Sequence, residues 1–133
     1  MPSSMLQLAI PLLHVSNSRA AEDFYTKGLG FHCFFVHRPD GRDDPAYLAL
    51  SRDRIAIHLS SHSGDAVPGG VANILVDDVD ALFAEFKSRG VRIDLEPTDQ
   101  TWGTREMYVK DADGNCLRFQ QEGRRSSDSD RPG

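Results

Sequence analysis

The residue with the clearest capacity to bind a ligand is Trp102, the only tryptophan of the chain, which stands directly before Gly103. An indole ring offers a flat face that stacks on planar or cationic groups. The glycine beside it predicts a hinged loop at the edge of a sheet, where that face would be accessible. The alternative is a tryptophan that covers the hydrophobic core, and the sequence leaves both interpretations open.

Residues suited to covalent chemistry are sparse. Cys33 and Cys116 have no metal-ligand spacing and lie in predicted strands, where a thiol is typical of a small hydrophobic side chain. No serine or cysteine has a base beside it in sequence, although a triad assembled in space stays open. Gly69-Gly70 is followed directly by no helix and is interpreted as a turn rather than a phosphate-binding loop. The sequence therefore predicts no catalytic residue and no cofactor.

The length and charge of the chain limit its class. Its 133 residues favour one domain or two small modules that share a core. The formal net charge of −5 disfavours nucleic acid as a partner and mildly favours cationic ligands. No apolar run approaches the ~20 residues that span a bilayer, and the first residues show no signal-peptide pattern. We therefore expect a cytoplasmic protein with reduced thiols and no membrane partner.

The first half of the chain alternates apolar runs and turn residues in a β-α-β-β-β order. Ser16-Asn17-Ser18 supplies an N-cap, and a helix is expected from there to about Lys27, ended by Gly28 or Gly30. Strands are expected at residues 7–15, 31–37, 46–50 and 54–60.

The second half repeats this order at an offset of about 60 residues. Asp77-Asp78 caps a helix that Gly90 ends, and strands are expected at residues 71–76, 91–95, 105–109 and 115–120. The predicted domains are a first module at 1–60, a flexible linker at 61–70, a second module at 71–121 and a disordered tail at 122–133.

Three features carry a resemblance to a known family. They are the doubled β-α-β-β-β order, the segment Ala-Glu-Asp-Phe-Tyr-Thr-Lys-Gly-Leu-Gly-Phe at 21–31, and Asp-Ala-Asp-Gly-Asn at 111–115. Over about residues 7–121 the chain resembles the vicinal-oxygen-chelate superfamily of glyoxalase I, extradiol dioxygenases and bleomycin-resistance proteins. Trp102-Gly103 followed by Arg105-Glu106, and Asp113-Gly114-Asn115-Cys116, resemble the bleomycin-resistance branch in particular.

The resemblance implies an α+β fold of two tandem βαβββ modules. Each module would curl its strands into a half-open cup with its helix on the convex side. In the bleomycin-resistance branch the partner cup usually comes from a second chain, so the resemblance implies a homodimer with ligand grooves at the interface. Whether the cups pair within one chain or between two stays open.

The resemblance also implies where a metal would be held. The metal-dependent members place His or Glu on four strands, at positions that correspond here to Ile10, His58, Val71 and Arg118. Only His58 has a lone pair to offer, and Arg118 would repel a cation. His14 would add one ligand if the register slips, whereas a divalent site normally has at least three protein ligands. We therefore expect no metal.

The function expected from this combination is stoichiometric capture of a bulky, planar, cationic antibiotic of the bleomycin type in a groove at the dimer interface. The aromatic residues would stack on the ligand, with one of Phe34 and Phe35 facing the core, and Glu106 would attract the cation. The candidate ligand-binding residues are Trp102, Phe34, Phe35, Tyr47, His58, Glu106, Tyr108 and Arg118.

Two other functions stay open, namely a metal-dependent enzyme of the glyoxalase or dioxygenase type and a binder of another aromatic drug or metabolite. For the charged candidates the alternative is a solvated surface group. For His58 it is an imidazole that lines the cup and is satisfied by a neighbour or water.

Overall fold

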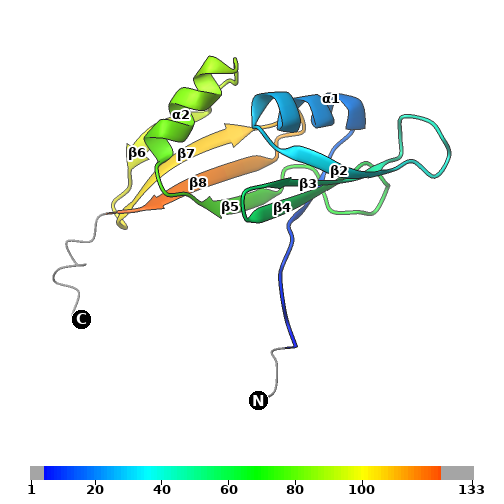
Figure 1. Ribbon diagram of the computed structural model, residues 1–133, viewed down its shortest axis with the longest axis horizontal. Coiled ribbons are helices and arrows are strands. Elements are labelled where there is room, and N and C mark those ends of the chain that lie inside the picture. Colours follow the sequence, from blue (N-terminus) through cyan, green and yellow to red (C-terminus); the bar gives the residue numbers. More distant parts are fainter. Residues whose placement is uncertain (1–4, 124–133) are drawn as a thin grey trace.

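The structure is a computed structural model that describes residues 5–123 of the chain. The strands form two four-stranded mixed sheets, each associated with one helical segment (Figure 1). The predicted α+β fold of two βαβββ modules is thereby confirmed. Within residues 5–123 no helix is long and apolar enough to cross a membrane.

The two modules share one topology. The elements are β1 (Leu12–His14), α1 (Ser18–Asp23), the π-helical turn η1 (Phe24–Gly28), β2 (His32–His37), β3 (Tyr47–Arg52), β4 (Ile55–Ser60), β5 (Val71–Leu75), α2 (Val79–Ser88), β6 (Leu95–Asp99), β7 (Thr104–Lys110) and β8 (Cys116–Glu122). The strand orders are β1-β4-β3-β2 and β5-β8-β7-β6. In each sheet the first strand of the module runs parallel to the last, and the other pairs are antiparallel.

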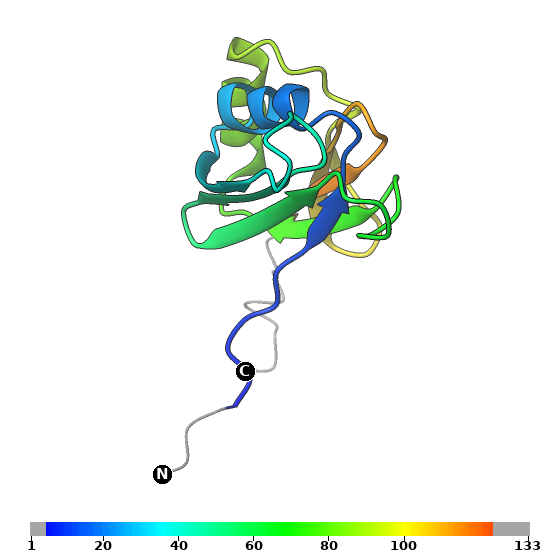
Figure 2. The same ribbon diagram turned by 90° about the vertical axis from the view of Figure 1, so that its right-hand side faces the viewer.

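Both helices lie on the same side of the sheets, and the N-terminal segment leaves on the opposite side (Figure 2). Side chains alternate across each strand, so one face of each sheet carries the apolar residues that pack beneath the helices. Leu48 and Leu50 of β3, with Met107 and Val109 of β7, belong to this core. The other face of both sheets is left without a covering layer of helices, and it is the face on which the candidate site is built.

The helices begin where the sequence predicts. The side chain of Asn17 accepts a hydrogen bond from the backbone N–H of Ala20 at 3.0 Å, and Asp78 accepts from that of Ala81 at 3.0 Å. Both contacts satisfy N–H groups that the first helical turn leaves without partners.

Two predicted strands differ from the observed ones. Strand β1 covers only Leu12–His14 and pairs with β4 alone, although the carbonyl of the preceding Pro11 still accepts a hydrogen bond from the His58 N–H at 3.0 Å. The predicted strand at 91–95 is wrong, and β6 instead runs over Leu95–Asp99. Val91 is apolar because it packs into the core after α2, not because it belongs to a strand. Pro97 is tolerated in β6 because this is an edge strand with a register irregularity.

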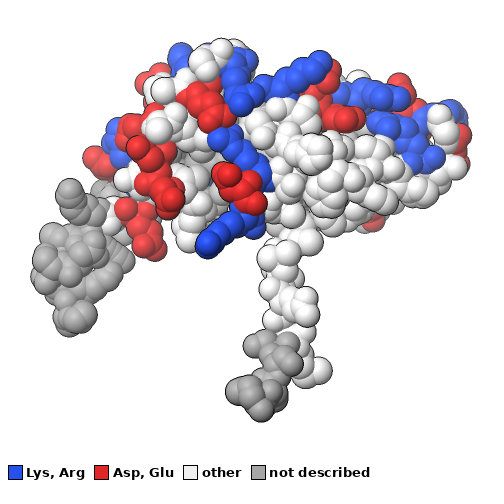
Figure 3. Space-filling model, in the orientation of Figure 1, with Lys and Arg blue, Asp and Glu red and all other residues white. Residues whose placement is uncertain are grey.

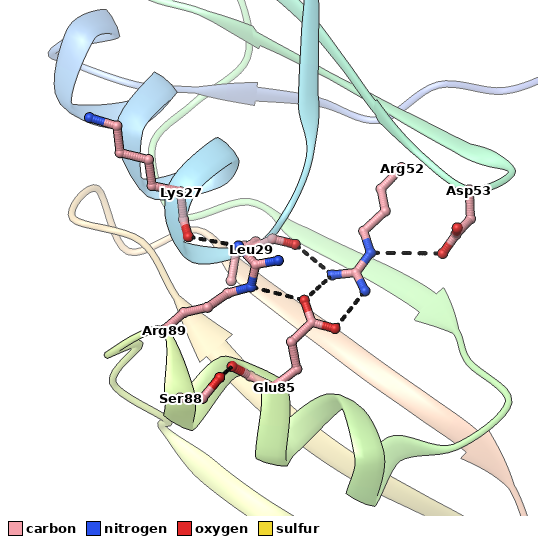
Figure 4. A network of polar contacts seen from close by, with 7 residues as sticks. All are labelled: Lys27, Leu29, Arg52, Asp53, Glu85, Ser88 and Arg89. Atoms are coloured by element: carbon pink, nitrogen blue, oxygen red, sulfur yellow. Dashed lines mark hydrogen bonds and ion pairs between the residues drawn. The ribbon is translucent and has the colours of Figure 1, made fainter.

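In the described part of the chain, hydrogen bonds and ion pairs join the two modules at two places, which are called fastenings below. At the first, Arg52 at the end of β3 donates to both carboxylate oxygens of Glu85 on α2, at 2.9 and 2.8 Å, and to the carbonyl of Leu29 at 2.8 Å (Figure 4). Arg89 donates to Glu85 at 3.0 Å and to the carbonyl of Lys27 at 3.1 Å. The hydrogen bonds from Arg52 hold the pKa of Glu85 below its ordinary value, against the opposing effect of burial.

The second fastening lies at the hairpin between β7 and β8. The hydroxyl of the fully buried Tyr25 donates to Asp111 at 2.8 Å. Asp111 also accepts from the backbone N–H groups of Asp113 and Asn115 and from the Asn115 amide, each at 2.9 Å. The same amide donates to the carbonyl of His14, so β1 is drawn into the network. Burial, and then the charge of Asp111, raises the pKa of Tyr25, which keeps its proton in this contact.

Candidate ligand-binding site

The uncovered face of the first sheet carries a row of side chains centred on His58. The register places Phe35 opposite Ala49, Ala49 opposite His58, and His58 opposite Leu12. Tyr47 lies one strand away from His58, and its hydroxyl shares a hydrogen bond of 2.8 Å with His58 Nδ1. The two rings meet edge to face with centroids 5.3 Å apart. This row, called the first wall below, is therefore aromatic.

The corresponding row of the second sheet is centred on Arg118. The register places Leu95 opposite Tyr108, Tyr108 opposite Arg118, and Arg118 opposite Asn73. The guanidinium of Arg118 lies over the Tyr108 ring, 5.0 Å from its centroid, in a cation–π arrangement. Because both rows occupy equivalent strands, His58 of the first module corresponds to Arg118 of the second.

Glu106 holds side chains of this second row in place; the row, together with Glu106 and Trp102, is called the second wall below. Glu106 lies on β7 two residues from Tyr108, is only 2% exposed, and accepts hydrogen bonds from three side chains. Trp102 Nε1 donates at 3.0 Å, the Tyr108 hydroxyl at 2.8 Å, and the Thr104 hydroxyl at 2.5 Å. Burial by itself would raise the pKa of Glu106, but these three donors outweigh it and the pKa lies below its ordinary range. A buried, ionised carboxylate thus fixes two aromatic side chains.

Trp102 remains accessible even though its ring is anchored. The side chain is 66% exposed, and its nitrogen edge points to Glu106. It therefore does not cap the core, which was the alternative drawn from the sequence. Its loop is held by Gly103, whose φ of +102° is a conformation that favours glycine, and whose carbonyl accepts from Gly123 N–H at 2.7 Å. An aromatic ring that is fixed at its edge and open on its face suits stacking.

Phe34 and Phe35 do not divide between core and cup as the sequence suggested. A register irregularity between Cys33 and Phe35 inserts Phe34 as an extra residue in β2. This bulge breaks the alternation of side chains, and both phenylalanines are about half exposed, at 55% and 50%. That expectation is wrong, and the bulge that explains it left no clear signal in the sequence.

Sequence reasoning missed two contributors to the second wall. Thr104 fixes Glu106, and Asn73 lies opposite Arg118, where its Oδ1 accepts from Gln120 Nε2 at 3.0 Å. Buried and exposed residues alternate strictly in β5 of the structure, which places Asn73 on this face. The observed register also puts Leu12, rather than Ile10, opposite His58.

Metal-ligating side chains do not gather in the described part of the chain. Among residues 5–123 no three His, Cys, Asp or Glu side chains lie close enough together to hold a metal ion. At the centre of the two rows stand one imidazole and one guanidinium, and a guanidinium repels a cation.

A cleft of about 630 Å³ lies elsewhere, between α2 and the β3–β4 hairpin, on the side of the sheets that carries the helices. It is lined chiefly by core-facing residues such as Phe31, Leu82 and Phe119, and none of the eight candidate residues borders it. In Figure 3 charged side chains lie along the top and at both ends of the molecule, whereas the described part of the N-terminal segment carries none.

The fold, with its two walls on the uncovered faces of the sheets, defines a class of protein. The chain matches the family described as "Glyoxalase superfamily protein" over residues 3–126, and it belongs to that superfamily. It is 31% identical to the bleomycin resistance protein of Geobacillus stearothermophilus over an alignment of 140 positions, gaps included, that covers 89% of this chain and 98% of that protein. A bleomycin resistance protein of Staphylococcus aureus has the same identity and coverage.

Solved structures agree with this assignment. The bleomycin resistance determinant encoded on transposon Tn5 has a TM-score of 0.71 at 26% identity, covering 88% of this chain and 98% of that one. A bleomycin-binding protein complexed with bleomycin has a TM-score of 0.70 at 26% identity, covering 88% of this chain and 99% of that one.

Proposed function

We propose that this protein binds a bulky, planar antibiotic of the bleomycin type by stoichiometric capture, without a metal and without chemical conversion. The observation that carries the proposal is Trp102, which a buried carboxylate holds in place while two thirds of the side chain stays exposed. Fixing an exposed indole at its edge lowers the entropy lost when a ligand stacks on its face. The relatives named bleomycin resistance protein support the same ligand class.

We further propose that two copies of the chain pair so that the uncovered sheet faces line a groove. Large apolar side chains stand exposed on this face and on the N-terminal segment, and exposed apolar groups of this extent mark an interaction surface. They are Met5, Leu6, Leu8, Phe34, Phe35, Val71 and Leu75. Pairing would cover them and would enclose the walls centred on His58 and Arg118.

Cytoplasmic localisation and the absence of nucleic-acid or membrane partners remain predictions from composition. The proposed tail at 122–133 also remains a prediction over most of its length. Strand β8 continues to Glu122, and residues 124–133 lie outside the described part of the chain.

The test is a fluorescence titration of EDTA-treated protein with metal-free and copper-loaded bleomycin. Because Trp102 is the only tryptophan, its emission reports on the proposed site. Saturable quenching with one ligand per groove, and unchanged bleomycin recovered afterwards, is the expected result. A free-tryptophan control corrects for absorption by the copper complex. A linear response identical to that control would refute antibiotic binding, and recovery of altered bleomycin would refute capture without chemistry.

The dimer is tested separately by sedimentation equilibrium. We expect twice the chain mass of 14.8 kDa at micromolar concentration. A matched variant, Phe35→Glu, places a charge on the proposed interface and should shift the equilibrium toward the monomer. A wild-type protein that stays monomeric at all concentrations would exclude the two-chain groove.

A further inference from the structure

Arg118 is a cation that pairs with no carboxylate in the described part of the chain. Arg118 forms no ion pair within residues 5–123, although nine other ion pairs are present there. Its Nε is shielded from solvent and has no hydrogen-bond partner among the described residues. A shielded donor that stays unpaired costs about 1–3 kcal/mol of stability. The Tyr108 ring and the charge of Glu106 stabilise the guanidinium in part, but no hydrogen bond among the described residues satisfies its Nε.

The neighbouring carboxylate does not neutralise it. Glu106 lies near enough for the charge of Arg118 to lower its pKa, but the two side chains form no ion pair within 4 Å. The Glu106 oxygens are instead occupied by Trp102, Thr104 and Tyr108. The Glu106 carboxylate therefore holds these three side chains in position and is poorly placed to receive a cationic group of a ligand.

A second donor stands beside the guanidinium. Asn73 lies directly opposite Arg118 in the register, and its Oδ1 is engaged by Gln120. Engaging the oxygen leaves the Asn73 Nδ2 group as a donor on the same face. A guanidinium and an amide N–H side by side, with an aromatic ring under the guanidinium, form a recognition surface for the planar oxygen pair of a carboxylate.

We infer that the second wall is a carboxylate-binding site, in which Arg118 and Asn73 hold a carboxylate attached to a planar aromatic frame that stacks near Tyr108 and Trp102. This inference deepens the proposed function by assigning a chemical group of the ligand to named residues, and it replaces the expectation that Glu106 attracts a cationic group. A singly charged carboxylate suits the site better than a doubly charged phosphate ester, because Glu106 places a negative charge nearby.

The experiment compares matched naphthalene derivatives by isothermal titration calorimetry on the full-length, EDTA-treated protein at fixed ionic strength. The probes are 2-naphthoate, the neutral 2-naphthamide, 2-naphthylmethylammonium and 2-naphthyl phosphate. We expect 2-naphthoate to bind at least about 10-fold more tightly than the amide and the ammonium, which corresponds to about 1.4 kcal/mol. The phosphate should bind more weakly than the carboxylate.

Three variants locate this preference. Arg118→Gln should reduce the preference for naphthoate over naphthamide to less than about 2-fold, and Arg118→Lys should retain part of it because charge remains while the planar fork is lost. Asn73→Asp should also weaken naphthoate binding, and it keeps the test valid if Arg118→Gln fails to fold. The control is Arg54→Gln, which removes the same charge beside the distant cleft and should change nothing.

Several outcomes would overturn the inference. They are equal affinity for the first three probes, a preference for the ammonium, tighter binding of the phosphate, a carboxylate preference that survives in Arg118→Gln, or no binding of naphthoate at millimolar concentration. If bleomycin fails to bind while the Arg118-dependent preference is present, the antibiotic proposal fails and the carboxylate site stands. If bleomycin binds and the preference is absent, the reverse holds.

Discussion

The two sheets present equivalent strands on their uncovered faces, but the side chains on these faces differ in chemistry. The first wall pairs the rings of Tyr47 and His58. The second places a guanidinium over a tyrosine and fixes both aromatic residues with a buried carboxylate. Topology alone therefore does not determine the character of a wall. In the proposed two-chain groove, an aromatic wall could face a charged one, so that each end of a ligand would meet a different surface.

The two fastenings between the modules likewise occupy equivalent positions but differ in chemistry. Each begins at the hairpin between the last two strands of a module and reaches the helical segment of the other module. From the first hairpin Arg52 forms a partly exposed ion pair with Glu85, and from the second Asp111 receives a buried tyrosine hydroxyl. Partly exposed ion pairs contribute little to stability, whereas an acceptor for a buried donor contributes more. The modules should thus be held together unequally.

The largest expected effect comes from removing the buried fastening. Asp111→Ala deprives the Tyr25 hydroxyl, the Asn115 amide and two backbone N–H groups of their acceptor. We expect a loss of about 2–4 kcal/mol in the free energy of unfolding, measured by urea denaturation. The control Asp23→Ala breaks only an exposed i,i+4 pair with Lys27 and should cost less than about 0.5 kcal/mol. Equal losses in the two variants would contradict the ranking.

Next in size is the effect of Trp102 on ligand binding. Trp102→Ala should weaken binding of the bleomycin-type ligand by about 1–3 kcal/mol and leave the thermal midpoint of unfolding near that of the wild type, as expected for a stacking residue. Because the variant has no tryptophan, calorimetry replaces fluorescence. The matched change in the first wall, Tyr47→Phe, keeps the ring and removes only its bond to His58, so it should have a smaller effect. A larger effect from Tyr47→Phe would move the main contact to the first wall.

The ion-paired fastening should show a smaller and pH-dependent effect. Since the folded pKa of Glu85 lies below its ordinary value, the pair stabilises the fold above pH about 4.5 and loses this contribution as the pH falls through the folded pKa. At pH 7, Glu85→Gln should cost about 1 kcal/mol, because both side chains are about 30% exposed and solvent screens the pair. The urea midpoints of variant and wild type should converge at low pH. A difference in urea midpoint that persists or widens in acid would show that the charge of Glu85 does not cause the stabilisation.

The smallest effect concerns the end of the chain. Truncation after Gly123 should leave the thermal midpoint nearly unchanged if the following residues add no buried surface, as their composition predicts. Truncation after Gln121 additionally removes Glu122, which pairs with Thr104, and the hydrogen bond from Gly123 to Gly103. A large drop from the first truncation would disprove the composition-based prediction.

The sequence was sufficient where local chemistry decided the outcome. The caps at Asn17 and Asp78, the alternation of Met107, Tyr108 and Val109, and the doubled element order were all readable. The sequence did not predict the features that depend on pairing between distant segments. The bulge that exposes Phe34 and Phe35, and the position of β6 after Val91, depend on the register with β3 and β7. The engagement of Glu106 by three side chains likewise appears only when the loop of Trp102 is placed against β7.

The hydrogen bond between Gly103 and Gly123 makes the end of β8 part of the proposed ligand-binding site. A side chain at position 123 would overlap the Gly103 carbonyl oxygen. Only glycine therefore fits at this position, where the chain packs against the loop that carries Trp102. A fluorophore or fused domain attached just beyond Gly123 would therefore be joined beside the loop whose indole ring we propose contacts the ligand. For the design of a biosensor, this junction is the point at which ligand occupancy could be converted into an optical signal.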